Sequence, residues 1–189
     1  MNLQVARSTD PGDGRALAIR PATPADAEAL AEFGERTFRD AFAADNRPDD
    51  VESYVGATYS VGRQRADLAD PLRTTLVVES GGRLVAYAQL RAGPPPSCVT
   101  GPSPLELLRF YVERASHGRG VARTLMDAVR SAARAGGAET LWLGVWERNA
   151  RAIAFYAKCG FRDAGSQPFI LGSDRQTDRV MTLALEPKT

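Results

Sequence analysis

A switch from strand to helix character inside one short segment constrains the fold of this chain more than any other feature. Residues 106–112 are apolar and typical of a buried strand, and residues 119–134 place apolar side chains at helical spacing. Only a short turn separates the two patterns, and it carries Gly118 and Gly120. A strand that passes through a glycine turn directly into an amphipathic helix predicts a sheet with helices packed against it.

The glycine turn also has the character of an anion site. Glycines at a strand-to-helix junction leave backbone N–H groups bare at the helix N-terminus, where the helix dipole adds partial positive charge. The turn at 117–122 therefore predicts a phosphorylated ligand. A P-loop is excluded because the chain has no Gly-Lys pair, and a dinucleotide fingerprint is disfavoured because Arg123 stands where it requires a third glycine. A tight turn without a ligand remains open on this segment alone.

Length and composition are typical of one globular domain. The chain has 189 residues, and we expect a single domain over 17–189 behind a mobile tail over 1–16. The formal net charge of +1 gives no electrostatic case for a nucleic-acid or membrane partner. Cys98 and Cys159 lack the spacing of metal ligands, so no metal site is expected and a reducing cytoplasm fits. No apolar run approaches the length of a membrane span, and residues 1–14 lack the apolar core of a signal peptide.

Changes of hydrophobic period predict the order of the elements. Thr23 and Pro24 start a long helix, and Gly81 with Gly82 joins two strands as a hairpin. The loop at 93–104 holds five prolines, which cannot enter a sheet interior. The predicted strands are 17–20, 74–79, 83–90, 106–112, 140–145, 167–171 and 179–185, and the predicted helices are 24–44, 48–59, 60–70, 119–134 and 149–158. The predicted fold class is α/β, a mixed central sheet of about seven strands with about four to five helices on both faces.

Two separated motifs resemble the signatures of the GNAT superfamily of N-acetyltransferases. The acetyl-CoA signature of that family, Arg/Gln-x-x-Gly-x-Gly/Ala, corresponds to His-Gly-Arg-Gly-Val-Ala at 117–122. The second signature, Asn-x-x-Ala-x-x-x-Tyr-x-x-x-Gly-Phe, is matched at Asn149, Ala152, Tyr156, Gly160 and Phe161. The resemblance covers residues 17–185 and implies the GNAT fold, in which two parallel strands, here 106–112 and 140–145, splay into a V-shaped cleft.

A narrower likeness connects the chain to the PaiA-type bacterial polyamine acetyltransferases. It is carried by residues 37–42, the helix around Tyr54, the strand 106–112 and the segment 169–178. This likeness implies a small amine as the acceptor, for example a polyamine. It is less specific for the substrate than the superfamily motifs are for the cofactor.

The superfamily resemblance implies acetyl-CoA as the co-substrate. The pantetheine arm is expected along the strand 106–112, and the pyrophosphate on the backbone N–H groups of the glycine turn, with Arg119 and Arg123 as charge partners. Asn149 is expected to cap its helix and to bond the pantetheine. His117 departs from the Arg or Gln of the family and is expected beside the CoA phosphates. The implied cofactor-binding residues are Phe110, Tyr111, Val112, His117, Gly118, Arg119, Gly120, Val121, Ala122, Arg123, Asn149 and Tyr156.

Acetyl transfer to an amine requires a neutral amine, a stabilised oxyanion and a proton for the leaving thiolate. The resemblance assigns Tyr156 as the general acid, since a phenol can supply that proton; a core tyrosine is the alternative. Some relatives carry a glutamate base on the second cleft strand, where this chain has Gly144. Glu106 is the leading substitute, acting through water, and a surface carboxylate is its alternative. Glu147 is a weaker candidate, and direct binding of a neutral amine would need no base.

The resulting hypothesis is an acetyl-CoA-dependent N-acetyltransferase that acetylates a primary amine of a small molecule by direct attack in a ternary complex. The candidate acceptor-site aromatics are Phe38, Phe42, Tyr54, Phe110 and Tyr111, although most such residues simply belong to the core. Two other functions stay open: acetylation of a protein N-terminus, a lysine or an aminoglycoside, and acyl-CoA binding by a regulator without turnover. Intact Tyr156 argues against the regulator. The exposed terminal strands could pair between copies, which favours a homodimer.

Overall fold

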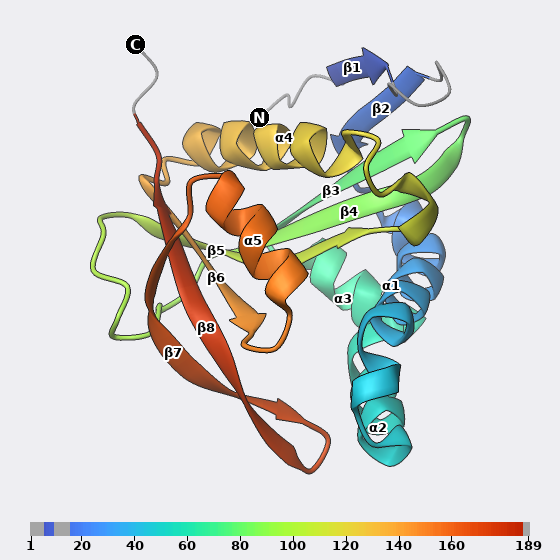
Figure 1. Cartoon of the computed structure of the whole chain (residues 1–189). Coiled ribbons are helices and arrows are strands. Elements are labelled where there is room, and N and C mark those ends of the chain that lie inside the picture. The colour runs from blue at the N-terminus through green and yellow to red at the C-terminus, as the bar shows by residue number, and fades with distance from the viewer. Residues whose placement is uncertain (1–5, 10–15, 187–189) are drawn as a thin grey trace.

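The computed structural model describes residues 6–9 and 16–186, and one eight-stranded sheet runs through it (Figure 1). The strands are β1 (Ala6–Thr9), β2 (Ala16–Pro21), β3 (Arg73–Ser80), β4 (Arg83–Arg91), β5 (Pro104–Val112), β6 (Thr140–Trp146), β7 (Arg162–Leu171) and β8 (Asp174–Ala184). The helices are α1 (Ala27–Phe42), α2 (Pro48–Tyr59), α3 (Val61–Ala69), α4 (Val121–Ala135) and α5 (Ala150–Lys158), and short 3₁₀ helices lie at Pro24–Asp26, Ala43–Asp45 and Arg114–Ser116. The strand order is β1-β2-β3-β4-β5-β6-β8-β7, in which β5 and β6 are parallel and the other neighbours antiparallel.

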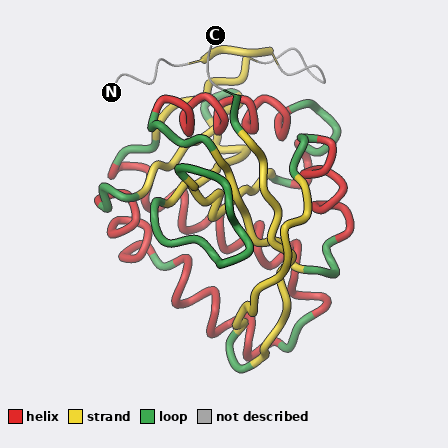
Figure 2. Tube along the Cα trace, turned by 90° about the vertical axis from the view of Figure 1, so that its left-hand side faces the viewer, coloured by secondary structure: helices red, strands yellow, loops and turns green. Residues whose placement is uncertain are grey.

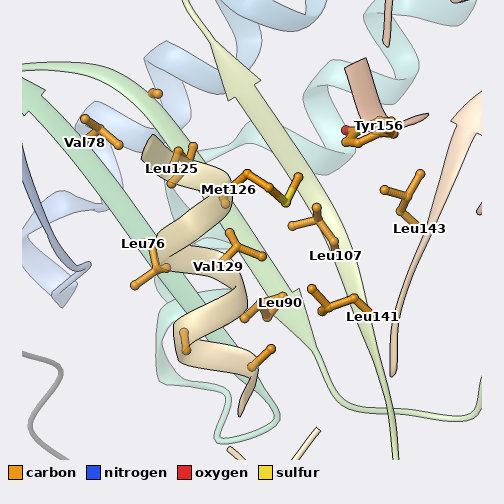
Figure 3. Close-up of a cluster of buried hydrophobic side chains, with 14 of the residues drawn as sticks. Leu76, Val78, Leu90, Leu107, Leu125, Met126, Val129, Leu141, Leu143 and Tyr156 are labelled. Atoms are coloured by element: carbon orange, nitrogen blue, oxygen red, sulfur yellow. The ribbon is translucent and has the colours of Figure 1, made fainter. Parts of the chain in front are cut away.

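Helices cover both faces of the sheet because its central strands are apolar on both faces. Successive side chains of a strand point to opposite faces. In β3, Leu76 and Val78 pack in the cluster that includes α4, whereas Val77 packs with Leu30 and Phe33 of α1. Figure 3 shows the first of these clusters, in which α4 lies against β3, β4 and β5. The predicted mixed α/β class with helices on both faces is confirmed. In the described part of the chain, no helix combines the length and apolar character that crossing a membrane requires.

The predicted tail over 1–16 contains a strand that the sequence pattern does not predict. β1 pairs antiparallel with β2, and Ala6 lies opposite Ile19. The free edge of a sheet offers backbone N–H and C=O groups to any short segment, so such pairing leaves little mark on the side-chain pattern. The sheet therefore has one strand more than the predicted set, and residues 1–5 and 10–15 lie outside the described part of the chain.

The two terminal strands form a longer hairpin than the predicted 167–171 and 179–185. β7 and β8 pair along nearly their whole length, as the long pair of strands in Figure 2 shows. Most residues of β7 are exposed or half-buried, so no apolar alternation marks its full extent. At the hairpin turn, Asp50 Oδ1 of α2 accepts hydrogen bonds from the Ser173 backbone N–H at 2.6 Å and from the Ser173 hydroxyl at 2.8 Å. The hairpin is thereby fixed to α2, more than a hundred residues away in the sequence.

β5 and β6 pair over only three residue pairs, so most of their length is not joined by a ladder between them. Their parallel pairing ends at Glu106 and Trp142. Directly after this point, the register of β5 against β4 shifts between Leu107 and Arg109, a β-bulge that bends the strand. β6 meanwhile stays paired with β8 to its last residue. The two strands therefore diverge, and the predicted splay between them is confirmed.

Candidate active site

The splay between β5 and β6 opens into a cavity of about 630 Å³, a size typical of small-molecule sites. Its lining comes partly from β5, the glycine turn and α5, and partly from α1, α2, β6 and the β7–β8 hairpin. The predicted site residues that line it are Phe110, Tyr111, Val112, His117, Gly118, Gly120, Ala122, Asn149 and Tyr156. The predicted residues that do not line it are Glu106, Arg119, Val121 and Arg123.

Backbone conformation explains the glycines of the turn. Gly118 and Gly120 have φ angles of +77° and +78°, in the left-handed region that residues with side chains rarely adopt. A Cβ added at Gly118 would meet no atom within 4 Å, so the backbone angle and not crowding requires glycine there. Gly120 immediately precedes α4, a helix of 15 residues with a fully developed dipole. The turn therefore brings the unpaired N–H groups of a long helix to the cavity.

His117 fastens the glycine turn to its neighbours. Its Nε2 lies 3.0 Å from the carbonyl oxygen of Val112, and its Nδ1 lies 3.0 Å from Nη1 of Arg151. A guanidinium can only donate, so Nδ1 accepts, and Nε2 carries the proton that is donated to Val112. These contacts join the glycine turn to the end of β5 and to the start of α5.

The arginines that line the cavity beside the turn are not the predicted pair. Arg114 and Arg151 line it, whereas Arg119 and Arg123 do not. Successive residues of a helix point about 100° apart, and Val121 at the start of α4 is fully buried in the core. Two residues further, Arg123 is turned away from both the core and the cavity and is exposed. The positive charge lining this part of the cavity therefore comes from Arg114 and Arg151.

Tyr156 lies on α5 with its ring packed among other aromatic side chains. The ring centroids of Phe110, Phe155 and Phe161 lie 6.2, 5.5 and 5.7 Å from its own. Burial raises the pKa of the Tyr156 phenol well above its ordinary value, so the hydroxyl stays protonated at neutral pH. The hydroxyl has no hydrogen-bond partner among the residues that the structure describes, and Tyr156 lines the cavity.

Asn149 occupies the predicted cap of α5. Its Oδ1 accepts a hydrogen bond from the backbone N–H of Ala152 at 3.1 Å, so the helix-capping prediction is confirmed. The cap uses only the oxygen of the amide. The Nδ2 group is left for another acceptor, on a residue that lines the cavity.

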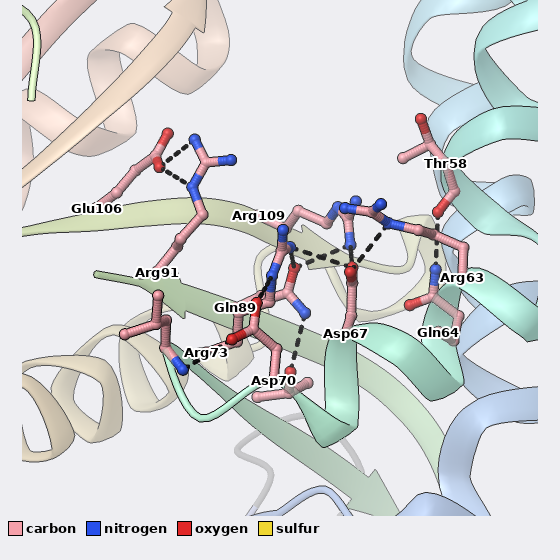
Figure 4. A network of polar contacts seen from close by, with 12 residues as sticks. Thr58, Arg63, Gln64, Asp67, Asp70, Arg73, Gln89, Arg91, Glu106 and Arg109 are labelled. Carbon is pink, nitrogen blue, oxygen red and sulfur yellow. Dashed lines mark hydrogen bonds and ion pairs between the residues drawn. The ribbon is translucent and has the colours of Figure 1, made fainter. Parts of the chain in front are cut away.

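Glu106 does not line the cavity that Tyr156 and Asn149 line. It sits at the last residue pair of β5 and β6, and its carboxylate lies 2.6 Å from the guanidinium of Arg91, as Figure 4 shows. Burial raises the pKa of Glu106, and the charge of Arg91 opposes that shift. Because Glu106 lies before the β-bulge, the structure does not bring it to the cavity with Tyr156.

Aromatic side chains from four elements line the other part of the cavity. We call this group, Phe38 and Phe42 of α1, Tyr54 of α2, Trp146 of β6 and Phe169 of β7, the aromatic wall. The ring centroids of Phe38 and Tyr54 lie 4.7 Å apart, those of Tyr54 and Phe169 5.5 Å, and those of Phe42 and Trp146 6.0 Å. The three predicted aromatics of α1 and α2 are thus joined by two that the sequence does not single out.

Arg109 is a buried cation beside the aromatic wall that sequence reasoning missed. Its Nη1 lies 2.9 Å from Asp67 Oδ2 and 2.9 Å from Gln89 Oε1, in the polar network drawn in Figure 4. Its guanidinium also lies 5.5 Å from the ring centroid of Tyr59. The pairing with Asp67 neutralises the charge, since an unpaired buried cation would be costly. Arg109 therefore lines the cavity where β5 bends, with its charge paired and its guanidinium hydrogen-bonded.

Asp178 of β8 is the second missed residue. It lines the cavity at 8 % exposure, and its carboxylate has no hydrogen bond or ion pair within the described part of the chain. Burial raises the pKa of Asp178 to about 6. The predicted strand began at residue 179 and so left Asp178 out. An acidic residue two positions before the buried Val180 shares its strand face, which is the signal that could have found it.

Comparison with known proteins agrees with this arrangement. The model of the acetyltransferase (GNAT) family matches residues 36–161. An uncharacterized N-acetyltransferase of Mycobacterium tuberculosis is 38% identical over 160 residues, which cover 85% of this chain and 98% of that protein.

Solved structures show the same fold. The PaiA N-acetyltransferase of Thermoplasma acidophilum, in complex with coenzyme A, superposes with a TM-score of 0.74 at 20% identity, covering 89% of this chain and 98% of that one. YncA of Salmonella typhimurium, solved with acetyl-CoA, has a TM-score of 0.62 at 24% identity, covering 92% and 96%. The family resemblance of the sequence motifs is confirmed: the chain belongs to the GNAT family and is an acetyltransferase with the GNAT fold.

Proposed function

We propose that this acetyltransferase transfers the acetyl group of acetyl-CoA to the primary amine of a small molecule. The observation that carries the proposal is a single cavity lined by the glycine turn, by Tyr156 and by the aromatic wall. Two substrates can meet in such a cavity, and its volume of about 630 Å³ favours a small acceptor. A polyamine is one acceptor of this class.

The glycine turn and β5 are the proposed acetyl-CoA site. The pyrophosphate would be held by the N-terminal N–H groups of α4, with Arg114 and Arg151 as charge partners. The pantetheine would lie along β5 at Phe110–Val112, beyond the last residue pair that joins β5 to β6. The free Nδ2 group of Asn149 would donate to it. The coenzyme A and acetyl-CoA complexes of the two structural neighbours support this assignment.

Tyr156 is the proposed general acid. The lone pair of the amine attacks the thioester carbonyl carbon, a C–N bond forms, the C–S bond breaks, and the leaving thiolate takes a proton from the phenol. The nitrogen then loses one proton, which restores the phenol and leaves the amide. Burial raises the pKa of Tyr156, which keeps that proton in place at neutral pH. Transfer is direct in this proposal, because neither Cys98 nor Cys159 lines the cavity to carry the acetyl group.

Thiol release from acetyl-CoA tests the proposal. The assay uses a panel of acceptors: alkyl polyamines, simple primary amines, aminoglycosides and peptides with free N-termini or lysines. We expect thiol release with small amines, together with an acetylated amine detected by mass spectrometry. Tight binding of CoA without turnover of any acceptor would instead identify an acyl-CoA-binding regulator, and preference for peptides would identify a protein acetyltransferase.

A further inference from the structure

The carboxylate of Asp178 lies in a space that Gly144 keeps free. A Cβ built on Gly144 of β6 would lie 2.9 Å from Asp178 Oδ2 and 2.8 Å from Gln167 Nε2. Both distances are shorter than real Cβ contacts, so any side chain at position 144 would displace the carboxylate. The backbone angle of Gly144 is not in the left-handed region, so glycine at this position bears on space and not on backbone conformation. Asp178 is thus accommodated by the neighbouring strand.

The surroundings of this carboxylate are suited to a cation. Tyr54 of α2 and Tyr111 of β5 line the same cavity, and burial, with a smaller contribution from the charge of Asp178, raises the pKa of both phenols. β6 places Trp146 opposite it in the ladder, and β7 places Gln167 there. Among the described residues no lysine or arginine pairs with it. A buried carboxylate without a counter-ion, beside aromatic faces, attracts a cationic ligand.

No other carboxylate in the described part of the chain has this combination of features. Glu106 is paired with Arg91 and does not line the cavity. Asp40 lines the cavity but is exposed to solvent. Asp67 lies under the cavity and is held by Arg109.

We propose, building on the proposed function, that Asp178 is a catalytic residue that binds the protonated acceptor amine and removes a proton from it. The ammonium gives one proton to the Asp178 carboxylate and becomes a neutral amine. Its nitrogen then attacks the thioester carbon, the C–S bond breaks, and the thiolate takes the proton of Tyr156. The second proton lost by nitrogen restores Tyr156, and the proton on Asp178 leaves to water. The products are the amide, CoA thiol and one released proton.

The burial of Asp178 fits this role. A pKa of about 6 leaves the carboxylate ionised at neutral pH and makes it a stronger base than an exposed aspartate. Desolvation in the aromatic part of the cavity also lowers the pKa of the bound ammonium, and the charge of the carboxylate opposes that shift. Desolvation favours proton transfer between the two groups because it destabilises both of their charged forms.

The test measures kcat/KM for the amine as a function of pH in three proteins: wild type, Asp178→Asn and the exposed α4 control Asp127→Asn. We expect an acid limb near pH 6 in wild type and in the control. Asp178→Asn should lose this limb and fall roughly 100-fold or more, as removal of a general base does. Its affinity for CoA, measured by calorimetry without amine, should stay unchanged.

A double variant tests the position of the carboxylate, and its affinity for CoA, measured by calorimetry, shows that it is folded. Asp178→Ala removes it, and Gly144→Glu in the same chain returns a carboxylate to the same space from β6. We expect the double variant to recover roughly tenfold or more over Asp178→Ala. Recovery supports the proposal, and its absence counts against it.

Failure of this proposal and failure of the proposed function give different results. Wild-type turnover with an unchanged rate or an unchanged acid limb in Asp178→Asn overturns the role of Asp178 alone. Absence of turnover in wild type with every amine overturns the proposed function and this role with it.

Discussion

The two parts of the cavity are built on different principles. The glycine-turn part comes from consecutive residues, and its chemistry is that of backbone N–H groups at a helix N-terminus. The aromatic part is assembled from side chains of α1, α2, β6, β7 and β8, which the fold brings together across most of the chain. The first part leaves a compact motif in the sequence, whereas the second leaves scattered residues that resemble an ordinary core. The part that matches the family signature can therefore be predicted from the sequence, and the part that we propose to hold the acceptor cannot.

The largest expected effect on activity is that of a substitution at Tyr156, the proposed general acid. We predict that Tyr156→Phe lowers kcat roughly 100- to 10,000-fold, because the leaving thiolate loses its proton donor. CoA affinity should not change. Tyr87→Phe is the matched control, since Tyr87 is fully buried outside the cavity and its hydroxyl has no partner in the described structure. Equal activity of the two variants in the thiol-release assay would remove Tyr156 from the mechanism.

Backbone conformation in the glycine-turn part can be tested with a pair of matched glycines. Gly118 and Gly82 have φ angles of +77° and +78°, and a Cβ at either position would meet open space. Valine should therefore cost about 1–3 kcal/mol of backbone strain at both positions. Only Gly118→Val should weaken CoA binding, roughly 10- to 100-fold in calorimetry. Matching CoA affinities in the two variants would contradict the pyrophosphate assignment.

In the aromatic part of the cavity, removal of a charge that we propose to be catalytic should increase the stability of the fold. Burial raises the folded pKa of Asp178 to about 6, above its unfolded value of about 3.9. The folded state therefore loses stability as pH rises from about 4 to about 6, where the buried carboxyl ionises. Asp178→Asn should gain about 1–3 kcal/mol over wild type at pH 7.5 and little at pH 4 in urea unfolding. A constant difference between the two proteins at both pH values would refute this linkage.

An aspartate outside the cavity should behave in the reverse way. Hydrogen bonds from Arg20 lower the pKa of Asp26 to about 2, and the same carboxylate closes the capping box with Thr23. Its contribution is present above the unfolded pKa of about 3.9 and is lost as pH falls towards 2. Asp26→Asn should cost about 1 kcal/mol at pH 7 and less in acid. If Asp26→Asn instead stabilised the protein at pH 7, the hydrogen-bond partners of Asp26 would not explain why the two aspartates differ.

The fold was largely predictable from local signals. Pro48 and Ser60 mark the starts of α2 and α3, and the paired glycines at 81 and 82 mark the β3–β4 turn. β1 is not predictable from the sequence pattern, because pairing at a sheet edge depends on backbone groups and leaves no pattern in the side chains. The full length of β7 is not predictable either, because its exposed residues do not alternate with buried ones.

The candidate site was predictable where one segment builds it and unpredictable where several do. The turn, the Asn149 cap and Tyr156 all come from two contiguous motifs. Arg151, by contrast, reaches the turn from α5, and the carboxylate of Asp178 occupies space that a side chain at position 144 of another strand would crowd. Such pairings between distant segments have no local signature. Glu106 is a candidate because of its position on the first cleft strand, but it precedes the β-bulge and does not line the cavity.

The most direct test of the central claim is the initial-rate pattern with both substrates varied. If the cavity holds acetyl-CoA and amine together, double-reciprocal plots at several fixed amine concentrations should intersect, as direct transfer in a ternary complex requires. Parallel lines, together with an acetylated protein detected by mass spectrometry in the absence of amine, would show a covalent acetyl-enzyme and contradict the account.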